Sequence, residues 1–592
     1  MLIKIWPEGV KKMPRKQRKE TRTAGQGLPK LVAIAAALSL IGSVKAAEIK
    51  TDNPDVQMRW DNTVRYNLGV RVEKAGNVAN NPNFDEGESK FDQGDVVTNR
   101  VDLLTEFDFI YRKNYGFRVS AAGWYDNAYQ NGESERNSHL PSSIAGSYVN
   151  DKYSSFTKRF YRGPSGEFLD AFVFGRFDLG DMPLTLKAGQ HTVFWGESLG
   201  LSGALHGVSY SQMPLDLRKA FATPGVEAKE LFLPLNNVSA QLVVTDDLAV
   251  AGQYFLDWDP TRIPEGGTYL GPADFLMYGS DRASAALING GVNKPKRQGD
   301  WGVSASWSPE WLDGSMGLYY RNFTDKIPSI FVTGSQYREY FGEDIDLFGI
   351  SLSKQIAGIS VSTEISYRKN MPLTAQTLGS ATASGALASV LYPNGAPSLK
   401  GNTYQARGET LHAVVNALGV ISDTALFDSA SWSAELSYAR LQKVTDNRDM
   451  FFGEGYGVCD EGRRAALGAR FRDKWDQCAT REVFALALNF TPSWLQALPG
   501  VDLSLPMSVS GTLSGNAPTQ LGGNEGNGNY SIGIGADVYS KYRFDLKFVD
   551  YFGKVKQRAG IVPGTTQVTS ANGLSTLLRD RGWVSFTFKT TF

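Results

Sequence analysis

The last ten residues of the chain, Trp583–Phe592, have the sequence WVSFTFKTTF. Mainly apolar side chains occupy every second position, namely Val584, Phe586, Phe588, Thr590 and Phe592. The positions between them are Trp583, Ser585, Thr587, Lys589 and Thr591. Alternation with a period of two residues predicts a β-strand with one apolar face.

The segment from Val56 to Glu73 repeats this pattern over a greater length. Apolar residues such as Met58 and Trp60 alternate with charged residues such as Arg65. A strand of a soluble protein has about 5 to 6 residues, whereas a tilted membrane strand needs about 9 to 11. The length therefore favours a strand that crosses a membrane, with its charged face toward water.

Similar segments recur along the whole chain. We expect strands at residues 56–72, 97–112, 117–126, 168–178, 184–195, 236–245, 248–258, 299–308, 315–323, 346–356, 359–368, 404–420, 429–441, 481–491, 501–513, 530–539, 542–552 and 582–592. Short connections, such as 357–358, alternate with long ones, such as 127–167. Bacterial outer-membrane barrels have an even number of strands, short periplasmic turns and long extracellular loops.

The sequence therefore predicts an all-β fold, a single transmembrane antiparallel β-barrel of about 18 strands, with about 16 to 20 as the range. Its long loops would be extracellular, and both ends of the barrel domain would lie in the periplasm. A β-propeller is the alternative all-β fold, but the chain shows no repeat of roughly 40 residues.

Residues 1–46 have the pattern of a secretory signal peptide. Nine basic residues between Lys4 and Lys30 precede the apolar run Leu31–Ile41, and small residues allow cleavage after Ala46 or Ala47. The apolar run is too short to span a bilayer. We therefore expect export, a barrel domain of residues 47–592, and a location in the outer membrane of a Gram-negative bacterium.

The charge balance changes when residues 1–46 are removed. Ten of the 61 basic residues and two of the 61 acidic residues leave, so 51 basic and 59 acidic residues remain, with a net charge of −8. Nucleic-acid binding needs a basic surface, so we expect no nucleic-acid partner. Apart from the signal segment, no stretch is apolar for the about 20 residues that a transmembrane helix requires.

The C-terminal strand also predicts partners. A strand that ends on Phe592, with Phe586 and Phe588 on the same face, is similar to the membrane-insertion signal of outer-membrane barrels. We therefore expect contact with the barrel-assembly machinery and with outer-membrane lipid. A periplasmic protein or a lipoprotein could be a further partner.

Several segments in the second two thirds of the chain form a specific set. They are Ala188–Gln190, Trp195–Ser198, Tyr254–Arg262, Ile263–Tyr269, Leu318–Lys326, Asp344–Leu352, Ile365–Leu373, Asp550–Gly553 and Leu577–Phe592. Together they resemble the proteobacterial outer-membrane family known as domain of unknown function 1302 (DUF1302). The resemblance implies a barrel. Because members accompany genes for the use of steroids, aromatics and other hydrophobic carbon sources, it also implies passage of small apolar molecules.

One segment matches a catalytic pattern. Gly196–Gly200 has the form G-x-S-x-G, with Ser198 in the position of a nucleophile and with His191 and His206 nearby in sequence. A nucleophile elbow needs the strand-to-helix turn of a parallel α/β sheet, whereas these strands are expected to be antiparallel. We therefore expect no catalytic residue, no cofactor and no metal.

Cys459 and Cys478 are the only cysteines, and both fall in one long loop. In an oxidising compartment two such residues are expected to pair. The bridge would stabilise the fold by about 3 kcal/mol in the entropic model.

Charged residues on the polar face of the predicted strands would line the lumen of the barrel. They are Arg59, Arg65, Arg71, Asp102, Glu106, Asp108, Arg543, Asp545 and Lys547. Charges in the lumen tune the selectivity of a pore. Their mixed signs argue against a simple cation or anion porin.

The connection 196–235 is too apolar for a loop exposed to solvent. An apolar loop must find cover, so it either folds into the lumen and narrows the pore or packs on the neighbouring outer loops as a lid. We favour the inward arrangement. The expected constriction residues are Trp195, Glu197, Arg218, Lys219 and Phe221.

These observations predict an outer-membrane channel for uptake of a small hydrophobic molecule, such as a steroid or an aromatic compound, by facilitated diffusion. One alternative is an outer-membrane hydrolase that uses a serine and a histidine of the lumen or a loop. The other is a structural or adhesive barrel whose long loops bind a partner.

Overall fold

The structure is a computed structural model. It describes residues 47–592 except 77–84, 138–140, 276–277, 334, 376–404, 467–471 and 561–563. The predicted signal peptide, residues 1–46, lies outside the described residues.

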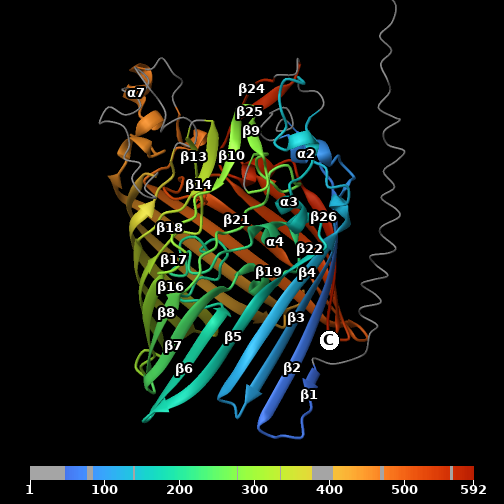
Figure 1. The fold of residues 1–592 in the computed structure, drawn as a ribbon. Helices are drawn as coiled ribbons and strands as arrows, with labels where there is room; N and C mark the ends of the chain where they lie inside the picture. Colours follow the sequence, from blue (N-terminus) through green and yellow to red (C-terminus); the bar gives the residue numbers. More distant parts are fainter. Residues whose placement is uncertain are drawn as a thin grey trace, which may run out of the picture.

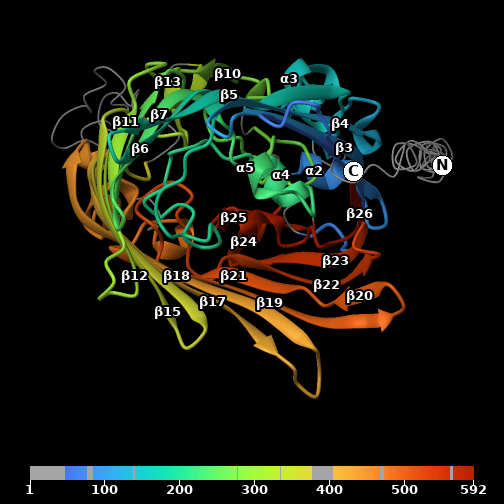
Figure 2. The same cartoon turned by 90° about the horizontal axis from the view of Figure 1, so that it is seen from below.

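In the described part of the chain, eighteen antiparallel strands form one closed barrel (Figure 1, Figure 2). Each pairs with the next, and β20 and β21 together occupy one position in the ring. The strands are β2 (Val56–Arg71), β3 (Val96–Tyr111), β4 (Tyr115–Asp126), β5 (Ser165–Leu179), β6 (Met182–His191), β7 (Leu235–Thr245), β8 (Leu248–Phe255), β11 (Trp301–Trp307), β12 (Gly314–Phe323), β15 (Ile345–Ile356), β16 (Ile359–Pro372), β17 (Arg407–Ser422), β18 (Ser429–Asp446), β19 (Glu482–Leu498), β20 (Val501–Ser504), β21 (Met507–Ser514), β22 (Gly528–Val538), β23 (Tyr542–Phe552) and β26 (Trp583–Thr591). The predicted fold class and strand number are confirmed.

The ring closes between the first and last strands. β26 pairs with β2 from Thr591 opposite Thr63 to Trp583 opposite Arg71. Beyond β26, Phe592 exchanges two backbone hydrogen bonds with Asn62, at 2.8 and 2.9 Å. β1 (Ala47–Ile49) then pairs with the next residues of β2 and covers the edge that the C-terminus leaves free.

Short turns join the strands at one end of the barrel, and the long connections extend at the other end (Figure 1). Several predicted strands were too short, because β18 continues to Asp446 and β19 to Leu498. In both strands the hydrogen-bonded ladder continues beyond the alternating segment. The ends of these two strands are therefore set by backbone hydrogen bonding to the neighbouring strands and not by the alternation of side chains.

The long connections contain small elements of their own. They are α2 (Glu86–Lys90), η4 (Asn127–Tyr129), η5 (Val149–Asp151), α3 (Ser155–Tyr161), α4 (Leu217–Ala222), α5 (Ala228–Leu231), β9 (Arg282–Ser284), β10 (Leu287–Val292), β13 (Ser329–Thr333), β14 (Gln336–Tyr340), η6 (Arg448–Met450), η7 (Gly457–Cys459), α7 (Glu461–Ala466), η8 (Lys474–Asp476), β24 (Val555–Ala559), β25 (Thr566–Ala571) and η9 (Ser575–Leu578). β9, β10, β13 and β14 form a separate small sheet above the barrel (Figure 1).

The side chains of the barrel are arranged in the opposite way to those of a soluble protein. On β18, Leu436 is 40% exposed, whereas its neighbours Glu435 and Ser437 are 0% and 1% exposed. Large apolar side chains, such as Val415 and Ile534, are exposed on other strands as well. A closed barrel with an apolar outer face and a polar interior suits a lipid surrounding. Among the described residues, no helix is long and apolar enough to cross a membrane.

We expect the substitution Leu436→Arg to lower the free energy of unfolding by about 2–4 kcal/mol, because it places a charge on the face toward lipid. Urea titration of protein folded into lipid vesicles measures this change. The control is Leu426→Arg in the short turn 423–428, where the side chain is 79% exposed and a surface substitution shifts stability by about 0.5 kcal/mol at most. Equal losses in the two variants would contradict a lipid-facing position for Leu436.

Candidate functional site

The connection between β6 and β7, residues 192–234, lies inside the barrel, and we call it the lumen loop. α4 and α5, which belong to it, appear within the ring of strands in Figure 2, and α4 lies at the height of the strands in Figure 1. The structure thus adopts the inward arrangement and not the lid. The lumen loop contacts the barrel wall through two separate sets of polar side chains.

A carboxylate of the wall holds the start of the lumen loop. Glu435 of β18 accepts hydrogen bonds from the amides of Leu199, Leu201 and Gly203, at 2.6, 2.9 and 2.6 Å. It also accepts one from the Ser198 hydroxyl, at 3.1 Å. A turn whose amides converge in this way forms an anion-binding concavity. The loop therefore binds to the wall through its backbone.

Glu364 of β16 holds the loop in the same manner. It accepts hydrogen bonds from the amides of Glu197 and Val208, at 2.8 and 3.1 Å. Gly196 has a φ of +94°, and a Cβ at this position would lie 2.2 Å from the Glu364 carboxylate. Only glycine permits both this backbone conformation and this approach.

Two arginines of the wall bind the carbonyls of the same segment, and a pair of imidazoles lies beside them. Arg321 donates to the carbonyls of Val208 and Tyr210, and Arg368 to those of Leu205 and Gly207, all within 3.1 Å. His206 Nδ1 lies 3.0 Å from Nδ1 of His412 on β17. Burial, with a smaller effect of Arg368, lowers the pKa of His206 to about 4. This imidazole is therefore neutral at pH 7.

The second half of the lumen loop forms ion pairs with the wall. Glu230 of α5 binds Arg65 of β2 through two hydrogen bonds, at 2.7 and 3.1 Å. Other pairs in this region are Lys229 with Glu106, Glu227 with Lys589, and Lys219 with Glu167. The strand pairings place β16–β18 five to nine of the eighteen positions away from β26, β2 and β3. The lumen loop therefore joins two separate parts of the wall.

A buried charge network fixes α4 within this arrangement. Asp216 accepts from Arg218 and Arg262, at 2.9 and 3.2 Å, and from the amide of Lys219 at the first turn of α4. Burial alone would raise the pKa of Asp216, but the charges of Arg218, Arg262 and Lys219 outweigh it and hold the pKa below its ordinary value. The carboxylate is therefore charged and holds α4 in position.

The predicted lumen residues lie on one face of the strands. Arg65 is opposite Asp102 and Arg59 is opposite Asp108 in the β2–β3 register, and residues directly opposite each other share a face. Three of the other predicted residues form ion pairs: Glu106 with Arg118 and Lys229, Arg71 with Glu88 of α2, and Arg543 with Asp537 and Asp545. Lys547 lies opposite Ser585 in the β23–β26 register.

The predicted constriction residues all belong to the lumen loop, but they have different surroundings. Trp195 is buried in an apolar cluster with Val208 and Tyr210. Glu197 contacts the wall through its backbone, whereas Arg218 and Lys219 are bound by acids. Phe221 packs on a buried cluster that is rich in tyrosines of the long connections.

The G-x-S-x-G segment builds the turn around Glu435. Among the described residues, the Ser198 hydroxyl bonds to Glu435 and to the amide of Gly200. His191 bonds to Ser239 and Gly189, and His206 bonds to His412 and Gly522. Ser198 is therefore bonded to a carboxylate and to a backbone amide, and the two histidines near it in sequence have other partners.

Two hollows border the lumen loop. The first, which we call the aromatic pocket, lies between α4 and strands β3 and β4; its lining includes Trp124, Tyr129, Phe160, Arg218, Ala222 and Tyr269. Its cavity volume is about 40 Å³, and its mouth is open to solvent. The second, with a cavity volume of about 20 Å³, is lined largely by apolar side chains such as Phe194, Leu205, Met213 and Phe232.

Sequence reasoning missed the wall residues that hold the start of the loop, namely Glu364, Glu435, Arg321 and Arg368. Their strand parity could have marked them as lumen residues. Their partners are mainly backbone groups far away in sequence; Leu199 and Glu435, for example, are 236 positions apart. No local pattern indicates such contacts.

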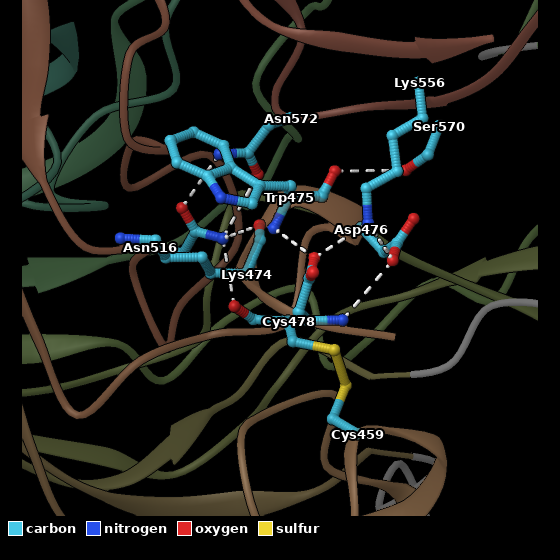
Figure 3. The surroundings of a disulfide bond; sticks show 10 residues. Cys459, Lys474, Trp475, Asp476, Cys478, Asn516, Lys556, Ser570 and Asn572 are labelled. Atoms are coloured by element: carbon cyan, nitrogen blue, oxygen red, sulfur yellow. Dashed lines mark hydrogen bonds and ion pairs between the residues drawn. A yellow bond between two sulfur atoms is a disulfide. The ribbon is translucent and has the colours of Figure 1, made fainter. Parts of the chain in front are cut away.

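The outer loops are joined to one another around a disulfide (Figure 3). Cys459 is bonded to Cys478, the predicted pair. Asn516 donates to the carbonyl of Cys478, at 2.9 Å, and Lys556 of β24 binds Asp476 beside it. The bridged loop thus contacts the connections 515–527 and 553–582.

We expect Glu435→Gln to release the start of the lumen loop, because an amide side chain offers one acceptor oxygen where the carboxylate accepts four hydrogen bonds. Hydrogen exchange at the amides of Leu199, Leu201 and Gly203 should become about tenfold faster or more, which corresponds to the loss of about 1.4 kcal/mol of protection. Glu310→Gln, in an exposed turn, is the matched control. Unchanged exchange in Glu435→Gln would disprove the anchoring role.

The chain was compared with solved structures, with curated proteins and with protein families. The crystal structure of Acinetobacter baumannii OccAB4 has a TM-score of 0.39 and 7% identity, with 92% of this chain and 100% of that chain covered. The crystal structure of Pseudomonas aeruginosa OccD3 (OpdP) has a TM-score of 0.37 and 9% identity, with 95% of this chain and 97% of that chain covered. Both TM-scores are too low to bear on function. No curated protein matches the chain. The family described as "Protein of unknown function (DUF1302)" matches residues 28–592, so the chain belongs to the DUF1302 family.

Proposed function

We propose that the protein is a channel of the bacterial outer membrane, exported by means of residues 1–46, that takes up a small hydrophobic molecule by facilitated diffusion. The closed barrel with its apolar outer face supports the membrane location. The polar interior supports a route through the barrel. Neither feature alone distinguishes a selective channel from a general porin.

The position of the lumen loop is the observation that supports a selective channel. The loop is tied to one wall by Glu435 and Glu364 and to the other by pairs such as Glu230 with Arg65. Arg65 and Glu230 are 2% exposed, and removal of one partner of a buried pair costs about 3–5 kcal/mol. A loop held so firmly at both ends is a permanent constriction, and a solute must pass beside it.

The surface of the constriction supports a hydrophobic cargo. Both hollows beside the lumen loop are lined mainly by apolar and aromatic side chains, as sites for small organic ligands usually are. Many charged groups of the wall are already paired, for example Arg65 with Glu230 and Lys219 with Glu167. Among the described residues, these pairs neutralise charge beside the loop and so weaken its attraction for an ionic solute.

We expect the protein in planar bilayers to show a small ionic conductance that rises several-fold in Glu230→Ala. The substitution removes the carboxylate that holds α5 against β2, so the second half of the loop loses one anchor. Glu454→Ala, at an exposed position of an outer loop, is the control and should conduct like the parent. A large conductance in the parent would instead indicate a general porin.

Growth of a deletion strain tests the cargo. We expect slower growth on apolar carbon sources, such as steroids, aromatics or long fatty acids, and unchanged growth on sugars. Complementation with the parent gene should restore growth. If growth is unchanged on every carbon source, the structural or adhesive alternative replaces the channel.

A further inference from the structure

The aromatic pocket is built around a stack of rings and cations. Trp124 of β4 and Phe160 of α3 are stacked, with ring centroids 6.0 Å apart and an interplanar angle of 17°. The Arg218 guanidinium lies 3.7 Å from the Phe160 centroid, and that of Arg100 lies 5.5 Å from the Trp124 centroid. Flat surfaces of this kind bind flat ligands by stacking.

More aromatic side chains line the same space. Tyr129, Tyr269 and Trp583 are all buried, and they come from three different segments of the chain. Ala222, at the end of α4, supplies a small side chain between these large ones. Because the pocket is open at its mouth, a planar ring could enter beside Ala222 with the rest of the molecule outside.

The charges around the pocket balance. Arg100, Arg218, Lys219 and Arg262 face an equal number of acids, which are Asp102, Asp126, Asp216 and Glu167. Burial of an additional unpaired charge would be costly. The pocket therefore favours an uncharged ligand.

The polar groups of the pocket include unused hydrogen-bond donors, whereas its carboxylate oxygens already accept hydrogen bonds. Both Asp126 oxygens and both Asp216 oxygens already accept hydrogen bonds. In the described part of the chain, Nη1 of the buried Arg218 has no hydrogen-bond partner. Tyr129, which is 3% exposed, accepts from the amide of Tyr269, so its own hydroxyl proton is available. A matching ligand carries an acceptor oxygen.

We propose that the aromatic pocket binds a planar, uncharged ring compound that carries a carbonyl or similar acceptor oxygen. The pocket adjoins the lumen loop through α4, so this inference names the cargo class of the proposed channel and rests on that function. Rings of the ligand would stack beside Trp124 and Phe160. Its oxygen would accept from Tyr129 or Arg218.

Calorimetric titration of the full barrel domain in lipid nanodiscs tests the proposal, with empty nanodiscs as the reference. We expect 2-acetylnaphthalene to bind several-fold more tightly than 2-ethylnaphthalene, which lacks the oxygen, and than 2-naphthoate, which is charged. Equal binding of the ethyl compound would overturn the role of the acceptor. Tighter binding of naphthoate would make the pocket an anion site and overturn the proposal.

Two variants connect the binding to this pocket. Ala222→Phe fills the space without removing a polar contact and should abolish binding, while heat-modifiable mobility on gels verifies the folded barrel. Tyr129→Phe should weaken binding of the acetyl compound several-fold but leave the ethyl compound unaffected. Tyr153→Phe is the matched control, because that buried hydroxyl bonds to the Gly267 carbonyl, at 2.6 Å, outside the pocket lining. Parent-like binding in folded Ala222→Phe would overturn the site.

The binding assay involves no transport. If the compounds bind, but the deletion strain grows normally and the ionic conductance is large, the proposed function is wrong and the binding site remains. A selective channel that binds none of the three compounds would overturn only the site.

Discussion

The structure depends on the closure of the sheet between β2 and β26. In lipid, a backbone amide or carbonyl without a partner costs several kcal/mol, so a membrane-spanning sheet cannot have a free edge. The pairing of Thr591–Trp583 with Thr63–Arg71 removes that edge, and the bonds between Phe592 and Asn62 extend it to the last residue. Closure then separates an apolar outer face from a polar interior.

A ring of this size encloses a space that its own wall side chains do not fill, and the lumen loop occupies part of it. The loop is anchored chiefly through backbone amides that bind Glu435 and Glu364. Hydrogen bonds to a charged acceptor contribute about 1.5–3 kcal/mol each. Wall carboxylates at one side and ion pairs at the other thus hold an apolar connection inside the barrel, where it borders two hollows.

Much of the fold was predictable. The alternation in Val56–Arg71 and in Trp583–Thr591 indicated membrane strands, and the succession of short and long connections indicated eighteen of them. The candidate site was predictable only in part. The composition of 196–235 indicated a loop that needs cover, but it left an inward loop and a lid as alternatives. Ser198 matched a hydrolase pattern by its neighbours, yet its hydroxyl bonds to a glutamate 237 residues away.

The sequence by itself determined where most strands lie and which residues share a face, because side-chain alternation has a period of two and is visible in each short segment. Tertiary structure alone decided where the lumen loop lies, which carboxylates hold it, and which rings surround the aromatic pocket. Those contacts join wall and loop residues far apart in the chain, such as Glu197 and Glu364. They come within hydrogen-bonding distance only after the barrel has closed.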